Sequence, residues 1–347
     1  MTGANEAPAL AVRNLRTYFR TPLGNVRAVD GVDLSVGAGK VLCVVGESGS
    51  GKSLTALSIM GLVDAPGQVM PGSEILLGGR DLARLSEPQM RKVRGAEVSM
   101  IFQEPMSSLN PVVRVGAQIV EAIRLHEPVS RADAMSRAVE MLRLVGITAP
   151  EQRVRDYPHQ MSGGMRQRVM IAMALACNPK VLIADEPTTA LDVTVQAQIL
   201  DLLQELRERL GMAVVFITHD LGVVAEIADE VAVMYAGQVV ERGAARAVLS
   251  APKHPYTRAL METIPLVGMD RTIRLKAIDG MVPSPLNFPV GCRFANRCDF
   301  AQDRCHAAPP PLIAAGGSEA ACWLVGEDLA SPEQADRPIT VARKAAP

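Results

Sequence analysis

A glycine-rich loop at residues 46–53 constrains this chain more than any other stretch. Its sequence, GESGSGKS, fits the pattern G-x-x-x-x-G-K-S of a phosphate-binding loop. The unbroken apolar run 41–45 before it is typical of a buried parallel strand, and residues 54–62 after it predict a helix. Strand, glycine loop and helix are the context that the motif requires, whereas a chance glycine turn containing a lysine would not need them.

The residues of this loop suit a nucleoside triphosphate with its metal ion. Glycines let backbone N–H groups turn inward around phosphate oxygens, and the start of the helix adds a favourable partial positive charge. Lys52 can reach the β- and γ-phosphates, and the Ser53 hydroxyl can hold Mg²⁺. The other candidate contacts to phosphate are Ser48, Gly49, Ser50 and Gly51.

Composition argues against several other classes of protein. The 347 residues allow two or three domains, and a hydrophobic share of 48% supplies a large core. A net charge of −1 and only 3% aromatic residues predict no nucleic-acid partner. No run of about 20 apolar residues could span a bilayer, and no signal peptide is visible. We therefore expect the cytosol, where the six cysteines are more often thiols or metal ligands than disulfides.

The regions around the loop differ in their patterns of apolar and polar residues. Residues 1–8 predict a disordered tail, and the alternation of apolar and polar residues over 9–36 predicts antiparallel strands with one wet face. Phe19, in the first of these strands, could stack on a base or pack in the core. A capping box and apolar residues at helical spacing within about 104–165 predict a helical subdomain inserted into an α/β core.

Polar residues end three further apolar runs. Gln103, the pair Asp185-Glu186 and His219 each stand at such an end, where open α/β sheets bind their ligands. Asp185 can hold Mg²⁺ through water, Glu186 can orient or deprotonate an attacking water, and His219 can touch phosphate. Each also has a plain structural alternative: a capped turn at Gln103, a helix cap at the acids, and a structural histidine.

A second glycine motif stands at Ser162, Gly163 and Gly164, before an alanine- and methionine-rich helix. A serine with two glycines can expose backbone donors to an anion at the start of a helix. Taken alone, the same residues are more typical of an ordinary turn that leads into a helix.

These motifs stand in an order that resembles the ATP-binding subunits of ABC transporters. The order is phosphate loop, Gln103, Ser-Gly-Gly, the Asp-Glu strand end, Asp192 and His219, and the resemblance covers about residues 10–250. It implies an α/β fold of the P-loop NTPase class, an ABC-type nucleotide-binding domain over 9–250. Such a domain has a mixed-sheet core, an antiparallel β subdomain and an inserted helical subdomain.

The resemblance also implies a role for each motif. Phe19 would stack on adenine, Gln103 would sense the γ-phosphate and join Ser53 and Asp185 around Mg²⁺, and Glu186 would polarise the attacking water. His219 would contact the γ-phosphate. Ser162, Gly163 and Gly164, with Asp192 nearby, would contact ATP bound to a second ATPase subunit, either a copy or a paralogue.

The C-terminal part resembles the oligopeptide/dipeptide transporter branch. The segments HPYT at 254–257, VPSP at 282–285 and GCRF at 291–294 carry this likeness, and Met165 after Ser-Gly-Gly is a trait of the same branch. We expect an extension over 251–325 and a loose tail over 326–347. Within the extension, Cys292, Cys298, Cys305 and Cys322 predict a metal site, because so short a segment usually needs a staple. Spacing leaves zinc, iron–sulfur and free thiols open, and the resemblance favours a 4Fe–4S cluster.

The expected function is ATP hydrolysis coupled to transmembrane transport. The resemblance implies a motor for peptide uptake on the cytoplasmic face of the plasma (inner) membrane. Its partners would be two membrane permease subunits and an extracytoplasmic substrate-binding protein. The alternatives are an importer ATPase for nickel or another small solute, and a soluble ABC ATPase not tied to transport.

Overall fold

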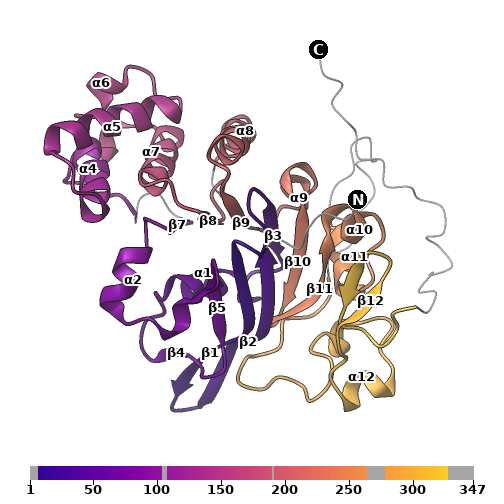
Figure 1. Cartoon of the computed structure of the whole chain (residues 1–347). Coiled ribbons are helices and arrows are strands. Elements are labelled where there is room, and N and C mark those ends of the chain that lie inside the picture. The colour runs from indigo at the N-terminus through magenta and orange to yellow at the C-terminus, as the bar shows by residue number, and fades with distance from the viewer. Residues whose placement is uncertain (1–6, 104–107, 190, 264–277, 327–347) are drawn as a thin grey trace.

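A computed structural model describes residues 7–103, 108–189, 191–263 and 278–326. Most of the two expected tails, at 1–8 and 326–347, therefore lies outside the described residues. Two sheets form the body of the molecule (Figure 1), and helices cover the larger one. One hydrophobic cluster lies on each side of this larger sheet, because its central strands are buried on both faces.

Within the described residues, the larger sheet has eight strands, in the order β12-β13-β11-β10-β3-β9-β8-β7. Its parallel part pairs β7, β8, β9, β3 and β10, and its antiparallel part adds β11, β13 and β12. The sheet is therefore mixed, as the sequence predicted. The strand bounds are β3 (Val41–Val45), β7 (Val98–Ile101), β8 (Val181–Asp185), β9 (Ala213–Thr218), β10 (Glu230–Tyr235), β11 (Gln238–Ala244), β12 (Ile313–Ala315) and β13 (Ser318–Ala320).

The smaller sheet is antiparallel, in the order β2-β1-β5-β6, and β4 also pairs with β1. The expected alternation holds in β2, where Val32, Leu34 and Val36 are buried and Ser35 is exposed. The buried side faces α1 (Lys52–Met60) and the larger sheet, in one shared cluster. The strand bounds are β1 (Leu10–Thr21), β2 (Gly24–Val36), β4 (Gly67–Val69), β5 (Glu74–Leu77) and β6 (Arg80–Asp81).

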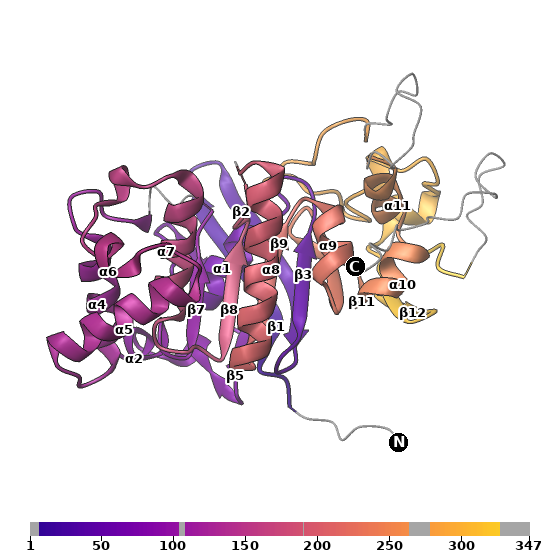
Figure 2. The same ribbon diagram turned by 90° about the horizontal axis from the view of Figure 1, so that it is seen from above.

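A group of helices stands apart at one end of the molecule (Figure 2). It consists of α4 (Val115–His126), α5 (Arg131–Leu144), α6 (Pro150–Arg153) and α7 (Gly163–Leu175). Ile119, Ile123 and Leu142 are fully buried between these helices, at the helical spacing that the sequence indicated. The other helices are α1 (Lys52–Met60), α2 (Glu87–Val93), α8 (Val193–Leu210), α9 (Leu221–Ile227) and α10 (Ala245–Ser250), with 3₁₀ turns at Leu82–Arg84 and Pro158–Gln160.

The C-terminal extension packs on the nucleotide-binding domain. It contains α11 (Pro255–Glu262), α12 (Asp303–Ala307) and a 3₁₀ turn at Ala295–Arg297. Its hairpin β12–β13 pairs with β11 and so lengthens the larger sheet. Tyr256 and Phe294 from the extension stack around Tyr235 of β10, which joins the two parts through a shared aromatic core.

Candidate nucleotide-binding site

The phosphate loop connects β3 to α1, and two of its glycines, Gly46 and Gly51, leave no room for a side chain. Gly46 has φ 151° and Gly51 has φ 98°, conformations that side chains disfavour. A Cβ at Gly46 would stand 2.1 Å from the Met234 carbonyl oxygen, and one at Gly51 would stand 2.6 Å from the Ala28 carbonyl oxygen. The loop therefore fits against β2 and β10 only when these positions carry no side chain.

Two polar side chains of the loop, Lys52 and Ser50, are buried without an anionic hydrogen-bond partner among the described residues. The Lys52 ammonium donates to the carbonyl oxygens of Gly46 and Glu47 at 2.7 and 3.0 Å, and burial lowers its pKa. The buried Ser50 hydroxyl makes no hydrogen bond to any of the described residues. Since a buried hydroxyl without a partner is costly, Ser50 and Lys52 fit a site that an anion completes.

Ser53 and Asp185 fit a divalent cation. The Ser53 hydroxyl donates to Asp185 Oδ1 at 3.0 Å. Burial is the largest cause of a raised Asp185 pKa, and the nearby Glu186 adds to it. A bound Mg²⁺ would relieve this unfavourable charge, and hydroxyl and carboxylate oxygens are the ligands that it prefers.

Glu186 is held by three side chains from three different segments. Gln103 Nε2 donates to Glu186 Oε2 at 3.0 Å, the Thr189 hydroxyl donates to the same oxygen at 2.9 Å, and His219 Nδ1 stands 3.3 Å from Oε1. Glu186 itself adopts φ 46°, an unusual backbone conformation that is often found at functional sites. Sequence reasoning missed Thr189, although its place three residues after Glu186 in a turn could have indicated this contact.

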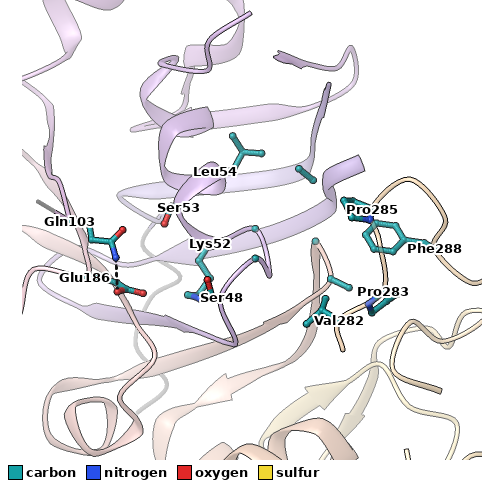
Figure 3. Close-up of a pocket in the computed structure, with 15 residues that line it drawn as sticks. Ser48, Lys52, Ser53, Leu54, Gln103, Glu186, Val282, Pro283, Pro285 and Phe288 are labelled. Atoms are coloured by element: carbon teal, nitrogen blue, oxygen red, sulfur yellow. Dashed lines mark hydrogen bonds between the residues drawn. The ribbon is translucent and has the colours of Figure 1, made fainter. Parts of the chain in front are cut away.

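Several of these residues line one pocket of about 310 Å³ (Figure 3). The volume lies at the lower end of the range for small-molecule sites. The predicted residues that line it are Ser48, Gly49, Gly51, Lys52, Ser53, Gln103 and Glu186.

The lining residues do not include the predicted site residues Ser50, Asp185, His219 and Phe19. Phe19 is half-buried in β1 and does not line the pocket. A Cβ added to Gly67 would stand 2.6 Å from the Phe19 ring and 2.6 Å from Val63, so the ring packs in a tight space beside β4. This is the packing alternative for an aromatic residue in a strand.

The second glycine motif lies outside this pocket. It stands at the N-terminus of α7, next to the N-terminus of α8. The Ser162 hydroxyl accepts from the Met165 N–H at 3.3 Å and caps α7, and Asp192 accepts from the Val195 N–H at 2.9 Å and caps α8. A Cβ at Gly164 would stand 3.0 Å from Val195. The two helix starts therefore lie side by side, and both caps are exposed.

The four C-terminal cysteines line one small cavity, and none forms a disulfide. The cavity measures about 10 Å³, room for about one water molecule. In the described ranges, no group of three or more histidine, cysteine or acidic side chains could hold a metal ion. Burial raises the pKa values of Cys292, Cys298 (to about 11) and Cys322, so these thiols stay neutral while no cation is bound. The structure thus does not support the predicted metal centre. Four cysteines are suitable ligands for a cluster, but the cavity between them is too small to hold one.

Loop, acidic strand end and sheet order together define a P-loop nucleotide-binding domain of the ABC class. The ABC transporter family model matches residues 29–189, and the model of the oligopeptide/dipeptide transporter C-terminal region matches residues 240–305. The chain belongs to the ABC transporter ATP-binding proteins of the oligopeptide/dipeptide branch. It is the ATPase component of a peptide transporter.

Several curated relatives match nearly the whole chain. A probable peptide ABC transporter ATP-binding protein of Sinorhizobium fredii is 54% identical, covering 92% of this chain and 95% of the relative. The oligopeptide transport ATP-binding protein AppD of Bacillus subtilis is 51% identical, over 92% and 97% of the two chains. The dipeptide transport ATP-binding protein DppD of Escherichia coli is 51% identical, over 93% and 98%.

Solved structures match the nucleotide-binding domain. A dimeric bacterial ABC transporter cassette has a TM-score of 0.61 and 28% identity, covering 68% of this chain and 99% of the other. The same cassette in a post-hydrolysis state bound to ADP and Pi gives the same values.

Proposed function

We propose that this chain hydrolyses ATP with Glu186 as the general base and so drives the uptake of peptides through separate membrane subunits. The observation that carries the proposal is the set of contacts to Glu186. Gln103 and Thr189 fix one carboxylate oxygen, and the other faces His219. A carboxylate held this way, at the end of the strand that also carries Asp185, is placed to take a proton from an attacking water.

The other pocket residues bind and neutralise the triphosphate. The backbone of residues 48–51 and the side chains of Ser50 and Lys52 would hold phosphate oxygens, since these donors converge at the start of α1. Ser53 and Asp185, with Gln103, would hold Mg²⁺, which supplies charge neutralisation when bound. His219 would contact the γ-phosphate.

A second ATPase subunit would complete the site. Ser162, Gly163 and Asp192 are exposed, Gly164 is half-buried, and all four lie away from the Lys52 pocket, which suits contact with ATP on another subunit rather than on their own. The solved cassette that this chain resembles is described as a dimer. The partner would be a copy of this chain or a paralogue.

The helical subdomain offers a site for a permease. A hollow of about 360 Å³ lies between α4 and α5, lined by Val120, Leu125 and Met135 together with Glu121, Arg124 and Arg131 among others. Leu125 is 73% exposed, which is unusual for so large an apolar side chain. A short cytoplasmic helix of a membrane subunit, apolar on one face and acidic on its rim, would fit this hollow.

Attachment through such partners suits the expected position on the cytoplasmic face of the inner membrane. No helix in the described ranges is long and apolar enough to cross a bilayer. An extracytoplasmic binding protein would deliver the peptide to the permease subunits.

The four cysteines remain candidates for a 4Fe–4S cluster, with zinc as the alternative. The support is that all four face the same small cavity and that none is oxidised to a disulfide. A cluster would need the cavity to widen and the buried thiols to lose protons. Iron and sulfide analysis of protein purified without oxygen tests this, and metal-free folded protein would remove the proposal.

Reconstitution with the membrane subunits tests the transport function. Vesicles that contain the two permease subunits, this chain and its ATPase partner should take up labelled dipeptides or oligopeptides when ATP is enclosed with the ATPase. Uptake of nickel but not of peptides would assign the alternative cargo. ATP hydrolysis without any association with membrane subunits would instead support a soluble ATPase.

Leu125→Glu should weaken co-purification with the permease, whereas Val290→Glu, at an equally exposed site on the extension, should not.

A further inference from the structure

The C-terminal extension supplies one wall of the nucleotide pocket. Val282, Pro283, Pro285 and Phe288 line the pocket together with the phosphate loop. In Figure 3 these four residues lie on one side of Lys52 and Ser48, while Gln103 and Glu186 lie on the opposite side. A nucleotide with its γ-phosphate toward Glu186 would therefore direct its base toward the extension.

The chemistry of this wall suits a purine base. Its side chains are apolar, and the neighbouring Ala28 and Ala236 add further apolar surface. Planar bases bind well to apolar and aromatic surfaces because stacking replaces contact with water. Phe288 is the aromatic side chain among the pocket-lining residues, whereas Phe19 packs beside β4.

The wall is fixed to the nucleotide-binding domain by polar contacts. The Arg27 N–H donates to the Pro285 carbonyl oxygen at 3.3 Å. The Arg293 guanidinium lies 3.8 Å from the centre of the Phe288 ring, and its own side chain is only 9% exposed. Arg293 in turn pairs with Asp30 of β2 and donates to the Ala236 carbonyl oxygen. Phe288 is thus held in place before any ligand binds, which lowers the entropic cost of binding.

We propose that the segment 282–288, with Phe288 at its end, is the base-binding wall of the ATP site. Arg293 is a positioning residue that holds the Phe288 ring. The inference deepens the proposed function and rests on it, because the pocket must first bind a nucleoside triphosphate. It gives the extension a direct part in nucleotide affinity.

The test compares two ligands that differ in the base. Calorimetry on the full chain measures the affinity for ATP and for tripolyphosphate, which lacks base and sugar, both with Mg²⁺. Phe288→Ala should weaken ATP binding about tenfold and leave tripolyphosphate binding unchanged, because only stacking is lost. Phe288→Trp should restore ATP affinity. Val290→Ala, two residues away at an 82% exposed position, is the matched control.

Three results would overturn the base wall. These are an unchanged ATP affinity in Phe288→Ala, an equal loss for both ligands, and a larger selective loss of ATP in Phe19→Ala than in Phe288→Ala. A wild-type chain that binds neither ligand would instead overturn the proposed function, and the base wall with it. Binding of tripolyphosphate by each variant also shows that the phosphate loop is intact.

Discussion

Arg297 of the extension forms a two-pronged ion pair with Glu47 of the phosphate loop, 250 residues earlier in the chain. The two nitrogen–oxygen distances are 2.7 and 3.1 Å, and the Arg297 side chain is 5% exposed. The Glu47 N–H also donates to the Tyr256 hydroxyl at 2.8 Å. The extension therefore holds the phosphate loop at both its backbone and its side chain.

Breaking this pair should loosen the phosphate loop. Arg297→Met keeps much of the side-chain volume and removes the charge, which leaves Glu47 without its main partner. Because Glu47 is 28% exposed, we expect a loss in unfolding free energy of about 2 kcal/mol, below the range for a fully buried pair. Denaturant unfolding measures this loss, and ATP affinity should fall with it.

A double-mutant cycle with Glu47→Gln provides the control. If the pair acts as described, the second substitution should cost little in the Arg297→Met background, because the interaction is already gone. Fully additive losses would show that the two residues act independently.

Replacing Glu186 should separate ATP binding from hydrolysis. Glu186→Gln keeps the shape of the side chain and can still bond to Gln103 and Thr189, yet it cannot accept a proton from water. We expect ATP affinity to persist and turnover to fall by about 10²–10⁴. Steady-state phosphate release and nucleotide binding on the same preparation check both halves. Turnover at the wild-type rate would remove Glu186 from its role as base.

Most of the ATP site was predictable, because phosphate chemistry ties it to short local patterns. The loop at 46–53 and the acids at the end of β8 follow from strand, glycine and carboxylate spacing, and the structure brings them together with Gln103 and His219. The neighbouring Thr189 is also local, and only its side-chain bond needed the structure.

The base end of the pocket was not predictable in the same way. Its wall at 282–288 lies more than 200 residues beyond the loop, and its position depends on long-range contacts such as Arg293–Asp30. The hydrophobic periodicity of a sequence gives no information on such a long-range contact. Phe19 is absent from the pocket lining for a related reason: an aromatic residue in a strand can face a ligand or a neighbouring strand, and Gly67 leaves room for the ring beside β4. For the four cysteines, the sequence gives the number and spacing of possible metal ligands. It does not give the size of the cavity between them, which decides whether a cluster fits.

The glycine at the start of the loop should tolerate no side chain. Gly46→Ala would place Cβ 2.1 Å from a backbone oxygen of β10, which cannot move without disturbing the sheet. Gly39→Ala is the matched control, because Gly39 also has positive φ, at 66°, but has nothing within 4 Å of the added carbon. We expect a loss of about 1 kcal/mol from strain alone at Gly39 and several times more at Gly46. Thermal unfolding of the two variants compares them directly, and equal losses would contradict the steric argument.

His254 should make the stability of the protein depend on pH. It is fully buried at the start of α11, its Nδ1 accepts from the Tyr256 N–H at 3.0 Å, and burial lowers its pKa from 6.5 to about 3. In the unfolded chain the imidazole binds a proton below about pH 6.5, while the folded protein keeps it neutral down to about pH 3. Its contribution to stability is therefore complete above pH 6.5 and falls by up to about 1.4 kcal/mol per pH unit below it. His254→Asn keeps an acceptor for the helix start and removes the titration. The difference in unfolding free energy between wild type and this variant should thus shrink or change sign from pH 7 to pH 5. A difference that stays constant with pH would show that the folded protein takes up the proton on His254 as readily as the unfolded chain does.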